Sequence, residues 1–168
     1  KINVIYNGIE LKKINFKKSF QKISYEFLIS DDQPILIFVG SGFKRKGLEE
    51  FLKIISKLRT KDIKAFVIGK DKNIKYYQDL SKELKIDNQV IFTGPRNDVD
   101  DFYTISDILL FPTHYDPFSN VVLEAMNFEN VVYTTSNNGA SEILDENFIM
   151  DQPYDNRIIK SIDNLLSN

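Results

Sequence analysis

The chain has 168 residues, with 22 Lys and Arg against 24 Asp and Glu, one His and no Cys. This length is enough for one domain with its own core, and a share of 42% hydrophobic and 27% charged residues is typical of a globular protein. The lack of Cys excludes disulfide scaffolds, Cys-ligated zinc, iron–sulfur clusters and thiol catalysis. No apolar run approaches the roughly 20 residues of a membrane-spanning helix, and no signal-peptide pattern opens the chain, so we expect a cytoplasmic domain.

The net charge of −2 hides an uneven distribution. Residues 1–85 carry 19 Lys and Arg against 10 Asp and Glu, whereas residues 86–168 carry 3 against 14. A basic half favours phosphates or an anionic membrane surface, although solvated helix faces in a Lys-rich composition explain the excess as well. Nucleic acid is not an expected partner, because the basic residues follow helical surface positions and do not interleave with aromatic ones.

Strand and helix patterns alternate along most of the chain. Residues 1–34 are predicted to be a lead-in, with a turn at residues 6–8 and a helix over residues 17–28. The predicted strands are residues 35–39, 65–68, 90–92, 108–111, 131–134 and 148–150, and the helices after them cover about 48–58, 74–84, 98–105, 119–128, 140–144 and 158–165. This alternation predicts an α/β fold: a doubly wound, parallel, six-stranded sheet of Rossmann-like type with right-handed crossovers. Such sheets bind ligands beyond the carboxyl ends of their strands.

The loop after the first predicted strand, residues 40–47 (Gly-Ser-Gly-Phe-Lys-Arg-Lys-Gly), is a candidate phosphate site. It contains GxG but not the third Gly of the dinucleotide fingerprint, and no acidic residue sits at the end of the second strand, which disfavours an NAD-dependent enzyme. A turn of small residues around Gly42, followed by Lys44, Arg45 and Lys46 at a helix start, can hold a pyrophosphate. A plain surface cluster of cations is the alternative, but cations are unfavourable at the positive end of a helix.

The loop after the fourth predicted strand carries two carboxylates. Asp116 lies in the loop, and Glu124 lies on the following helix with seven residues between them. The N–H groups of residues 118–121 are expected to be free at the start of that helix, where they can receive phosphate or hydroxyl oxygens while the carboxylates accept sugar hydroxyls. Alone, the pair is better explained as a turn residue and a solvated helix residue. Beside the basic loop, it predicts a sugar-phosphate site.

Three further features are weaker. The loop at residues 93–97 can present backbone groups to a flat base, and the loop at residues 136–142 is usable for the same ligand. Residues 98–101 (Asp-Val-Asp-Asp) look like a metal-binding DxD motif, but acidic residues at a helix N-terminus explain them better. His114 can contact the ligand, yet no accompanying nucleophile pattern supports a role as a general base.

Several stretches together resemble one known family. They are Tyr6-Asn7-Gly8-Ile9, Phe38-Val39-Gly40-Ser41 with Arg45-Lys46-Gly47, Val67-Ile68-Gly69, Phe92-Thr93-Gly94, residues 107–112, residues 116–126, and Gly139 with Glu142. These residues resemble the C-terminal, donor-binding domain of the family 4 retaining glycosyltransferases with the GT-B fold, most of all the lipopolysaccharide-core glucosyltransferases. The acidic residue, seven others and a Glu at residues 116–124 form the most specific element.

The resemblance implies a function for the whole chain. Residues 1–168 would be the nucleotide-sugar (donor) binding domain, with residues 1–34 as the lead-in from an N-terminal acceptor domain that this chain lacks. The activity implied is retaining transfer of a hexose from a nucleotide-diphosphate sugar, with a UDP-sugar as the expected donor, to a glycan or lipid-linked acceptor in lipopolysaccharide or cell-surface glycan synthesis. It implies no metal and no cofactor. The fragment alone is expected to transfer little, and peripheral contact with the inner face of the cell membrane is left open for the full-length protein.

The resemblance also assigns roles to residues. Arg45 and Lys46 would neutralise the donor pyrophosphate, Asp116 would hold the donor sugar, and these three form the expected catalytic set. Glu124 would bind the ribose. The expected donor-binding set is Gly42, Gly94, Arg96, His114, Phe118, Ser119, Asn120, Val121 and Glu124.

This chain departs from the family pattern at several positions. Asp116 stands where the family has Glu, Ser119 where Gly is common, and residues 129–131 replace Gly-x-Pro. The last loop also lacks the double Gly. These departures bear on the donor sugar more than on the class of activity. The alternative function is a non-catalytic module that binds a nucleotide or a sugar phosphate.

Overall fold

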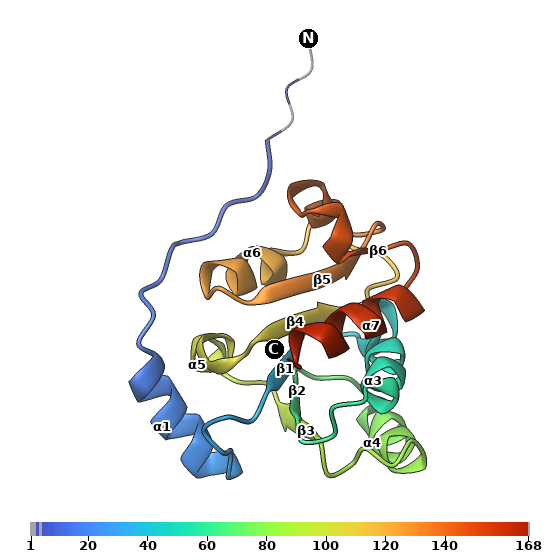
Figure 1. Cartoon of the computed structure of the whole chain (residues 1–168). Coiled ribbons are helices and arrows are strands. Elements are labelled where there is room, and N and C mark those ends of the chain that lie inside the picture. Colours follow the sequence, from blue (N-terminus) through green and yellow to red (C-terminus); the bar gives the residue numbers. More distant parts are fainter. Residues whose placement is uncertain (1–2, 4, 168) are drawn as a thin grey trace.

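The computed structural model describes residue 3 and residues 5–167, and it is built around one sheet of six parallel strands (Figure 1). The spatial order is β3-β2-β1-β4-β5-β6, and every neighbouring pair is parallel. The predicted doubly wound fold is therefore confirmed. The strands are β1 (Ile35–Val39), β2 (Lys64–Ile68), β3 (Val90–Gly94), β4 (Ile108–Phe111), β5 (Val131–Thr135) and β6 (Ile149–Met150).

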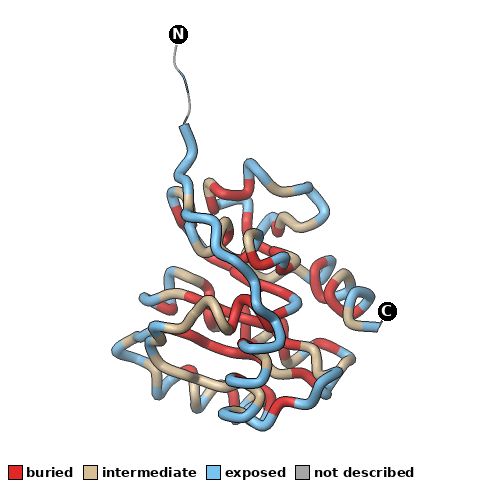
Figure 2. The backbone as a smooth tube through the Cα atoms, turned by 90° about the vertical axis from the view of Figure 1, so that its left-hand side faces the viewer, coloured by how far each residue is buried: buried red, intermediate tan, exposed pale blue. Residues whose placement is uncertain are grey.

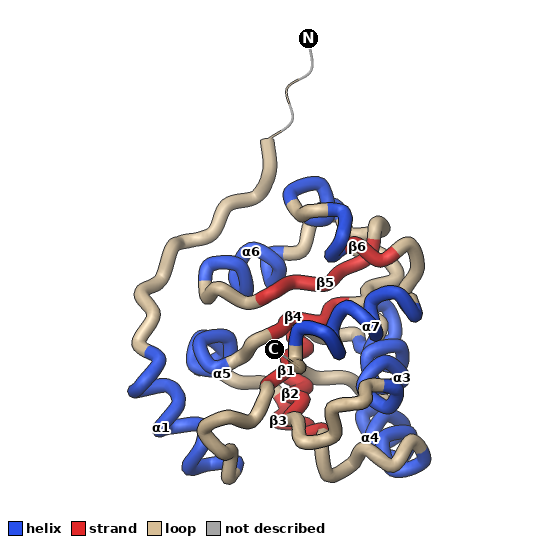
Figure 3. The backbone as a smooth tube through the Cα atoms, in the orientation of Figure 1, coloured by secondary structure: helices blue, strands red, loops and turns tan. Residues whose placement is uncertain are grey.

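Helices cover both faces of the sheet (Figures 1 and 3). One layer holds α3 (Leu48–Lys57), α4 (Ile74–Glu83) and α7 (Asn156–Leu165), and the other holds α1 (Phe16–Phe27), α5 (Val99–Ile105) and α6 (Asn120–Asn127). Because the chain leaves β1 toward one layer and β4 toward the other, a crevice opens between the carboxyl ends of these two neighbouring strands. None of the described helices is long and apolar enough to cross a membrane.

The local predictions differ from the structure in three places. The loop after β1 contains a one-turn helix, α2 (Phe43–Lys46), which lies between two glycines with positive φ, Gly42 and Gly47. The short helix expected at residues 140–144 is a 3-10 helix, η1 (Gly139–Ile143), and a second one, η2 (Glu146–Phe148), precedes β6. Residues 5–15 form no turn at residues 6–8; they are extended, exposed apart from the half-buried Ile9, and they run alongside α6 (Figures 1 and 2).

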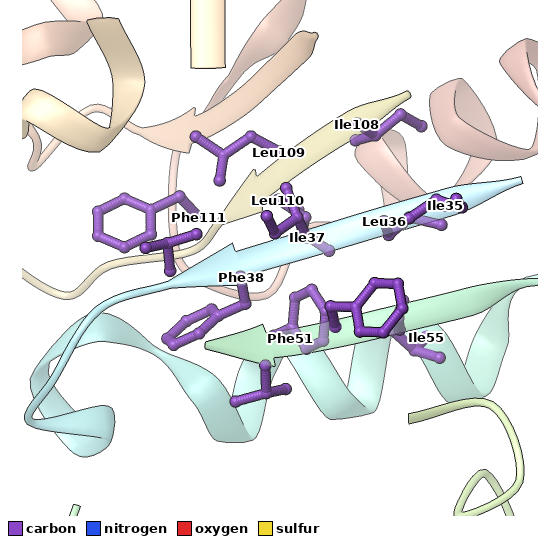
Figure 4. Close-up of a cluster of buried hydrophobic side chains, with 14 of the residues drawn as sticks. Ile35, Leu36, Ile37, Phe38, Phe51, Ile55, Ile108, Leu109, Leu110 and Phe111 are labelled. Carbon is purple, nitrogen blue, oxygen red and sulfur yellow. The ribbon is translucent and has the colours of Figure 1, made fainter. Parts of the chain in front are cut away.

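The core lies between the central strands and the helices. All five residues of β1 are buried, as expected for a strand covered on both faces. Figure 4 shows side chains from β1, β4 and α3 gathered in one apolar cluster. In it, the Phe38 ring lies 5.5 Å from the Phe51 ring and 5.9 Å from the Phe111 ring, measured between centroids. This cluster fixes the strand ends that carry the crevice.

We expect Phe38→Ala to lower the free energy of unfolding by about 3–5 kcal/mol, because Phe38 is fully buried and its removal leaves a cavity. The control is Phe16→Ala, since Phe16 is 55% exposed and its ring stacks on that of Phe20 within the same helix. Its cost should be about 1 kcal/mol or less. Urea unfolding of both variants measures this difference, and equal costs would contradict the central position of Phe38.

Candidate active site

The loops that follow β1 and β4 meet at the crevice. A Cβ atom added to Gly47 would lie 1.8 Å from the Pro112 carbonyl oxygen, so only glycine permits this approach. The N–H of His114 donates to the Arg45 carbonyl at 2.9 Å, and the Thr113 hydroxyl donates to the same oxygen at 3.1 Å. The predicted juxtaposition of the basic loop with the loop carrying Asp116 is therefore confirmed.

Lys46 and Asp116 form an ion pair that is almost buried, with 13% and 8% of their side chains exposed. The Lys46 ammonium bonds Oδ2 of Asp116 and lies 5.0 Å from the centre of the Phe111 ring. The Ser119 hydroxyl donates to the same Oδ2 at 3.0 Å. A buried ammonium needs a counterion, and Asp116 supplies it. The structure thus joins Lys46 and Asp116, and it places Arg45, the third residue expected to be catalytic, beside the same carboxylate.

Arg45 is the more accessible cation of the crevice. Its guanidinium donates to the Tyr115 carbonyl at 2.9 Å and lies 3.6 Å from Oδ2 of Asp116, yet 51% of its side chain is exposed. Together with Lys44 and His114 it lines an open cavity of about 360 Å³. The His114 ring lies 3.3 Å from the Glu50 carboxylate.

An acidic residue missed by the sequence analysis lies beside the basic loop. Asp71 comes three residues after β2, and its Oδ2 accepts the N–H of Phe43, the first residue of α2, at 2.8 Å. Asp71 lies beyond the end of the second strand and holds the start of α2, so it does not restore the dinucleotide fingerprint. Gly42, predicted to bind the donor, precedes α2 with a φ of 73°.

The start of α6 is held by a buried side chain that the sequence analysis treated only as part of a ligand loop. Asn138 is fully buried, and its Oδ1 accepts the N–H of Ser119 at 3.2 Å and that of Ala140 at 3.1 Å. Its Nδ2 donates to the Thr134 hydroxyl at 3.0 Å. The N–H of Ser119 is therefore not free, contrary to prediction. The N–H groups of Phe118, Asn120 and Val121 remain candidates for a ligand. An Asn directly before Gly139 was the available sequence signal.

Glu124 lies on the side of α6 that faces α5. The buried Tyr103 hydroxyl donates to its Oε2 at 3.1 Å. Burial, and then the neighbouring Glu124 carboxylate, raise the pKa of Tyr103 well above its usual value, so the phenol stays a proton donor. Glu124 lines a cavity of about 210 Å³ together with Asn120 and Asp100. Its carboxylate is thus fixed one helical turn beyond the start of α6.

Arg96 and the acidic run after it are engaged in ion pairs. The Arg96 guanidinium binds the Glu26 carboxylate at 2.7 Å and the Asp98 carboxylate at 2.8 Å, which directs it toward α1 and not toward Asp116. It holds the pKa of Asp98 well below the usual range. Gly94, expected to line the base, ends β3 with a φ of 72°.

The carboxylates of the DxD-like run each have a basic partner. Asp98 and Asp101 bind Lys22, and Asp100 binds Lys12. Within the described part of the chain, no group of three or more His, Asp or Glu side chains could hold a metal ion. The interpretation as an acidic first turn of α5 is confirmed for Asp100 and Asp101, but Asp98 makes no capping hydrogen bond because its side chain binds Arg96.

We expect Arg96→Met to lower the free energy of unfolding by about 1–2 kcal/mol at pH 7, because it leaves Asp98 and Glu26 without their guanidinium. The folded-state pKa of Asp98 is depressed, so its contribution is present above the unfolded pKa of about 3.9 and is lost as the pH falls through the folded value. In urea unfolding, the difference in free energy of unfolding between the variant and the unsubstituted chain should therefore shrink as the pH falls from 5 to 2. Arg59→Met is the control, since that side chain is 82% exposed. A pH-independent gap, or equal losses, would contradict a structural role for Arg96.

Comparison with known proteins assigns the family. The family model "Glycosyl transferases group 1" matches residues 19–168. The lipopolysaccharide glucosyltransferase WaaG of Escherichia coli is 32% identical over 111 residues, which are 64% of this chain and 29% of WaaG. The chain spans between 29% and 38% of the length of three curated relatives that it matches.

Solved structures agree with this assignment. The C-terminal domain of a glycosyl transferase group 1 family protein (LpcC) from Francisella tularensis superposes with a TM-score of 0.75 at 25% identity, covering 92% of this chain and 83% of that one. Anabaena HepE, solved in complex with UDP and glucose, superposes with a TM-score of 0.86 at 17% identity, covering 99% of this chain and 47% of that one. This chain belongs to the glycosyl transferases group 1 family and has the fold of a GT-B C-terminal domain.

Proposed function

We propose that the crevice between β1 and β4 binds a nucleotide-diphosphate sugar, with a UDP-sugar as the expected donor, for retaining transfer to a glycan or lipid-linked acceptor. The observation that carries the proposal is the half-exposed Arg45 side chain beside the buried pair of Lys46 and Asp116, opposite the start of α6. The UDP and glucose named for the HepE complex, and the glucosyltransferase name of WaaG, support this choice of ligand.

The geometry suits a diphosphate leaving group. Breaking the bond between sugar and phosphate builds negative charge on the nucleotide diphosphate, and positive groups fixed in place stabilise that charge most in the transition state. Arg45 is the half-exposed cation at Asp116, Lys46 is the nearly buried one, and the start of α6 lies beside the same carboxylate through Ser119. No step of this scheme requires a metal.

The two carboxylates would position the donor on either side of the first turn of α6. Oδ2 of Asp116 is engaged by Lys46 and Ser119, which leaves Oδ1 to accept a hydroxyl of the donor sugar. Oε2 of Glu124 is engaged by Tyr103, which leaves Oε1 to accept a ribose hydroxyl. Each carboxylate is therefore oriented by a side chain of the protein before the donor arrives, which reduces the entropy lost on binding.

The proposal for the whole protein goes further than this chain. Because the chain spans under half of its curated relatives, we infer that a preceding domain binds the acceptor, on the cytoplasmic side of a membrane where lipid-linked glycans are built. The chain alone is then a donor-binding unit that transfers little or no sugar.

We expect Arg45→Ala to weaken the binding of UDP and of UDP-glucose by about 10- to 100-fold, because charged hydrogen bonds contribute about 1.5–3 kcal/mol each. Isothermal titration of the chain with UDP, GDP, ADP and their glucose conjugates measures this. Arg59→Ala is the matched control, as it removes a far more exposed guanidinium at the opposite end of α3.

The same titration separates a transferase from a non-catalytic module. Asp116→Asn should remove affinity that depends on the sugar, so that UDP-glucose no longer differs from UDP. If the unsubstituted chain binds UDP but is indifferent to every sugar attached to it, the nucleotide-binding module is the better description. If the chain binds no nucleotide or nucleotide sugar, the proposal is wrong.

A further inference from the structure

The extended N-terminal segment at residues 5–12, called here the strap, crosses α6 on the outside of the molecule (Figures 1 and 2). The strap adds nothing to the hydrophobic core, in which the first residue along the chain is Ile23. An extended segment of eight residues without a core contact needs other interactions to hold it in one place. Those interactions are concentrated at both ends of the strap.

The N-terminal end of the strap contacts the start of α6. The Tyr6 ring stacks on the Phe118 ring with centroids 5.4 Å apart and an interplanar angle of 26°. The Tyr6 hydroxyl donates to the Glu142 carboxylate at 2.7 Å, and the Asn7 side chain donates to that of Asn120 at 3.2 Å. Phe118 and Asn120 lie on either side of Ser119. Tyr6 and Asn7 therefore hold the same short segment to which the proposed function assigns the donor.

The C-terminal end of the strap contacts α5 and α6 through Lys12. Its ammonium binds the Asp100 carboxylate of α5 at 2.6 Å, and its carbonyl accepts the Asn127 side chain of α6 at 3.3 Å. The strap thus runs from the first turn of α6 to its last and bridges α6 to α5.

Between these attachments, the strap covers a cavity that contains Glu124. The cavity has a volume of about 210 Å³ and is open to solvent. Asn120, Glu124 and Asp100 belong to the helices below it, whereas Gly8 and Ile9 close it from the strap. The Glu124 carboxylate thus faces a half-open space between α6 and the strap. A hydrogen bond from a ribose hydroxyl to a carboxylate is stronger where protein replaces part of the surrounding water, because the local dielectric is lower.

We propose that the strap is a wall of the nucleotide site and that Tyr6 is its positioning residue, which keeps the strap closed over the ribose bound by Glu124. This inference rests on the proposed function, since it takes the ligand to be a nucleoside diphosphate. In this proposal Tyr6 contacts neither the sugar nor the phosphates. It acts by holding the strap in place through its stacking on Phe118 and its hydrogen bond to Glu142.

The test compares ligands that differ only at the ribose. We expect Tyr6→Ala to weaken UDP binding by about tenfold, the upper range for one aromatic pair, while inorganic pyrophosphate, which needs Arg45 and not the strap, binds within about twofold of the unsubstituted chain. The preference for UDP over 2′-deoxy-UDP should shrink in parallel, because it reports the contact between Glu124 and the ribose. Tyr6→Phe, which keeps the ring stacking, should lie in between.

Tyr25→Ala is the matched control, since Tyr25 is 88% exposed on α1 and far from Glu124 in sequence. It should change neither affinity, and thermal unfolding should show both Ala variants folded. If UDP binds the chain but Tyr6→Ala leaves its affinity and the preference over 2′-deoxy-UDP unchanged, the strap inference is wrong while the proposed function stands. If neither UDP nor pyrophosphate binds the unsubstituted chain, both fail.

Discussion

The ion pair between Lys46 and Asp116 is the constraint on which the site depends. It joins the loop after β1 to the loop after β4, two segments about 70 residues apart in the chain, at the point where the order of the strands reverses. Removing a charge of this kind from water costs several kcal/mol, and the cost is offset only when a partner and further hydrogen bonds are in place. Here Ser119 adds the further bond, and the Phe111 ring lies under the ammonium. The crevice is therefore shaped before any ligand enters.

The same pair explains why Arg45 and Lys46 differ. Both lie in one turn of helix and both approach Oδ2 of Asp116, but Lys46 occupies the buried position and Arg45 stays half exposed. Arg45 is held by the Tyr115 carbonyl, a neutral partner, so its positive charge is only partly compensated. A buried cation paired with an acid gives rigidity, and an exposed cation beside it gives attraction for an anion. The two functions are divided between neighbours.

The parts of the structure that the sequence predicts are those set by local patterns and by topology. Continuous apolar runs such as residues 35–39 indicate buried strands, and in a parallel sheet the loops after β1 and β4 must then lie at one edge. The sequence does not predict which side chains pair across long separations. Three such contacts depend on tertiary packing: the hydrogen bonds of Asp71 with Phe43, of Asn138 with Ser119, and of Glu26 with Arg96. Asn7-Gly8 favours the turn predicted at residues 6–8, whereas the contacts of the strap with α6 keep these residues extended.

The uneven charge of the chain finds its explanation in these same pairings. The basic first half supplies Lys12 and Lys22 to the acidic start of α5, and Lys46 to Asp116, while Arg96 of the acidic half pairs back with Glu26. Part of the charge division is therefore satisfied by ion pairs between the two halves of the chain. The half-exposed guanidinium of Arg45 differs from these paired groups. Its nearest carboxylate, Asp116, is already bound by Lys46, so an incoming diphosphate meets little competition for the Arg45 guanidinium.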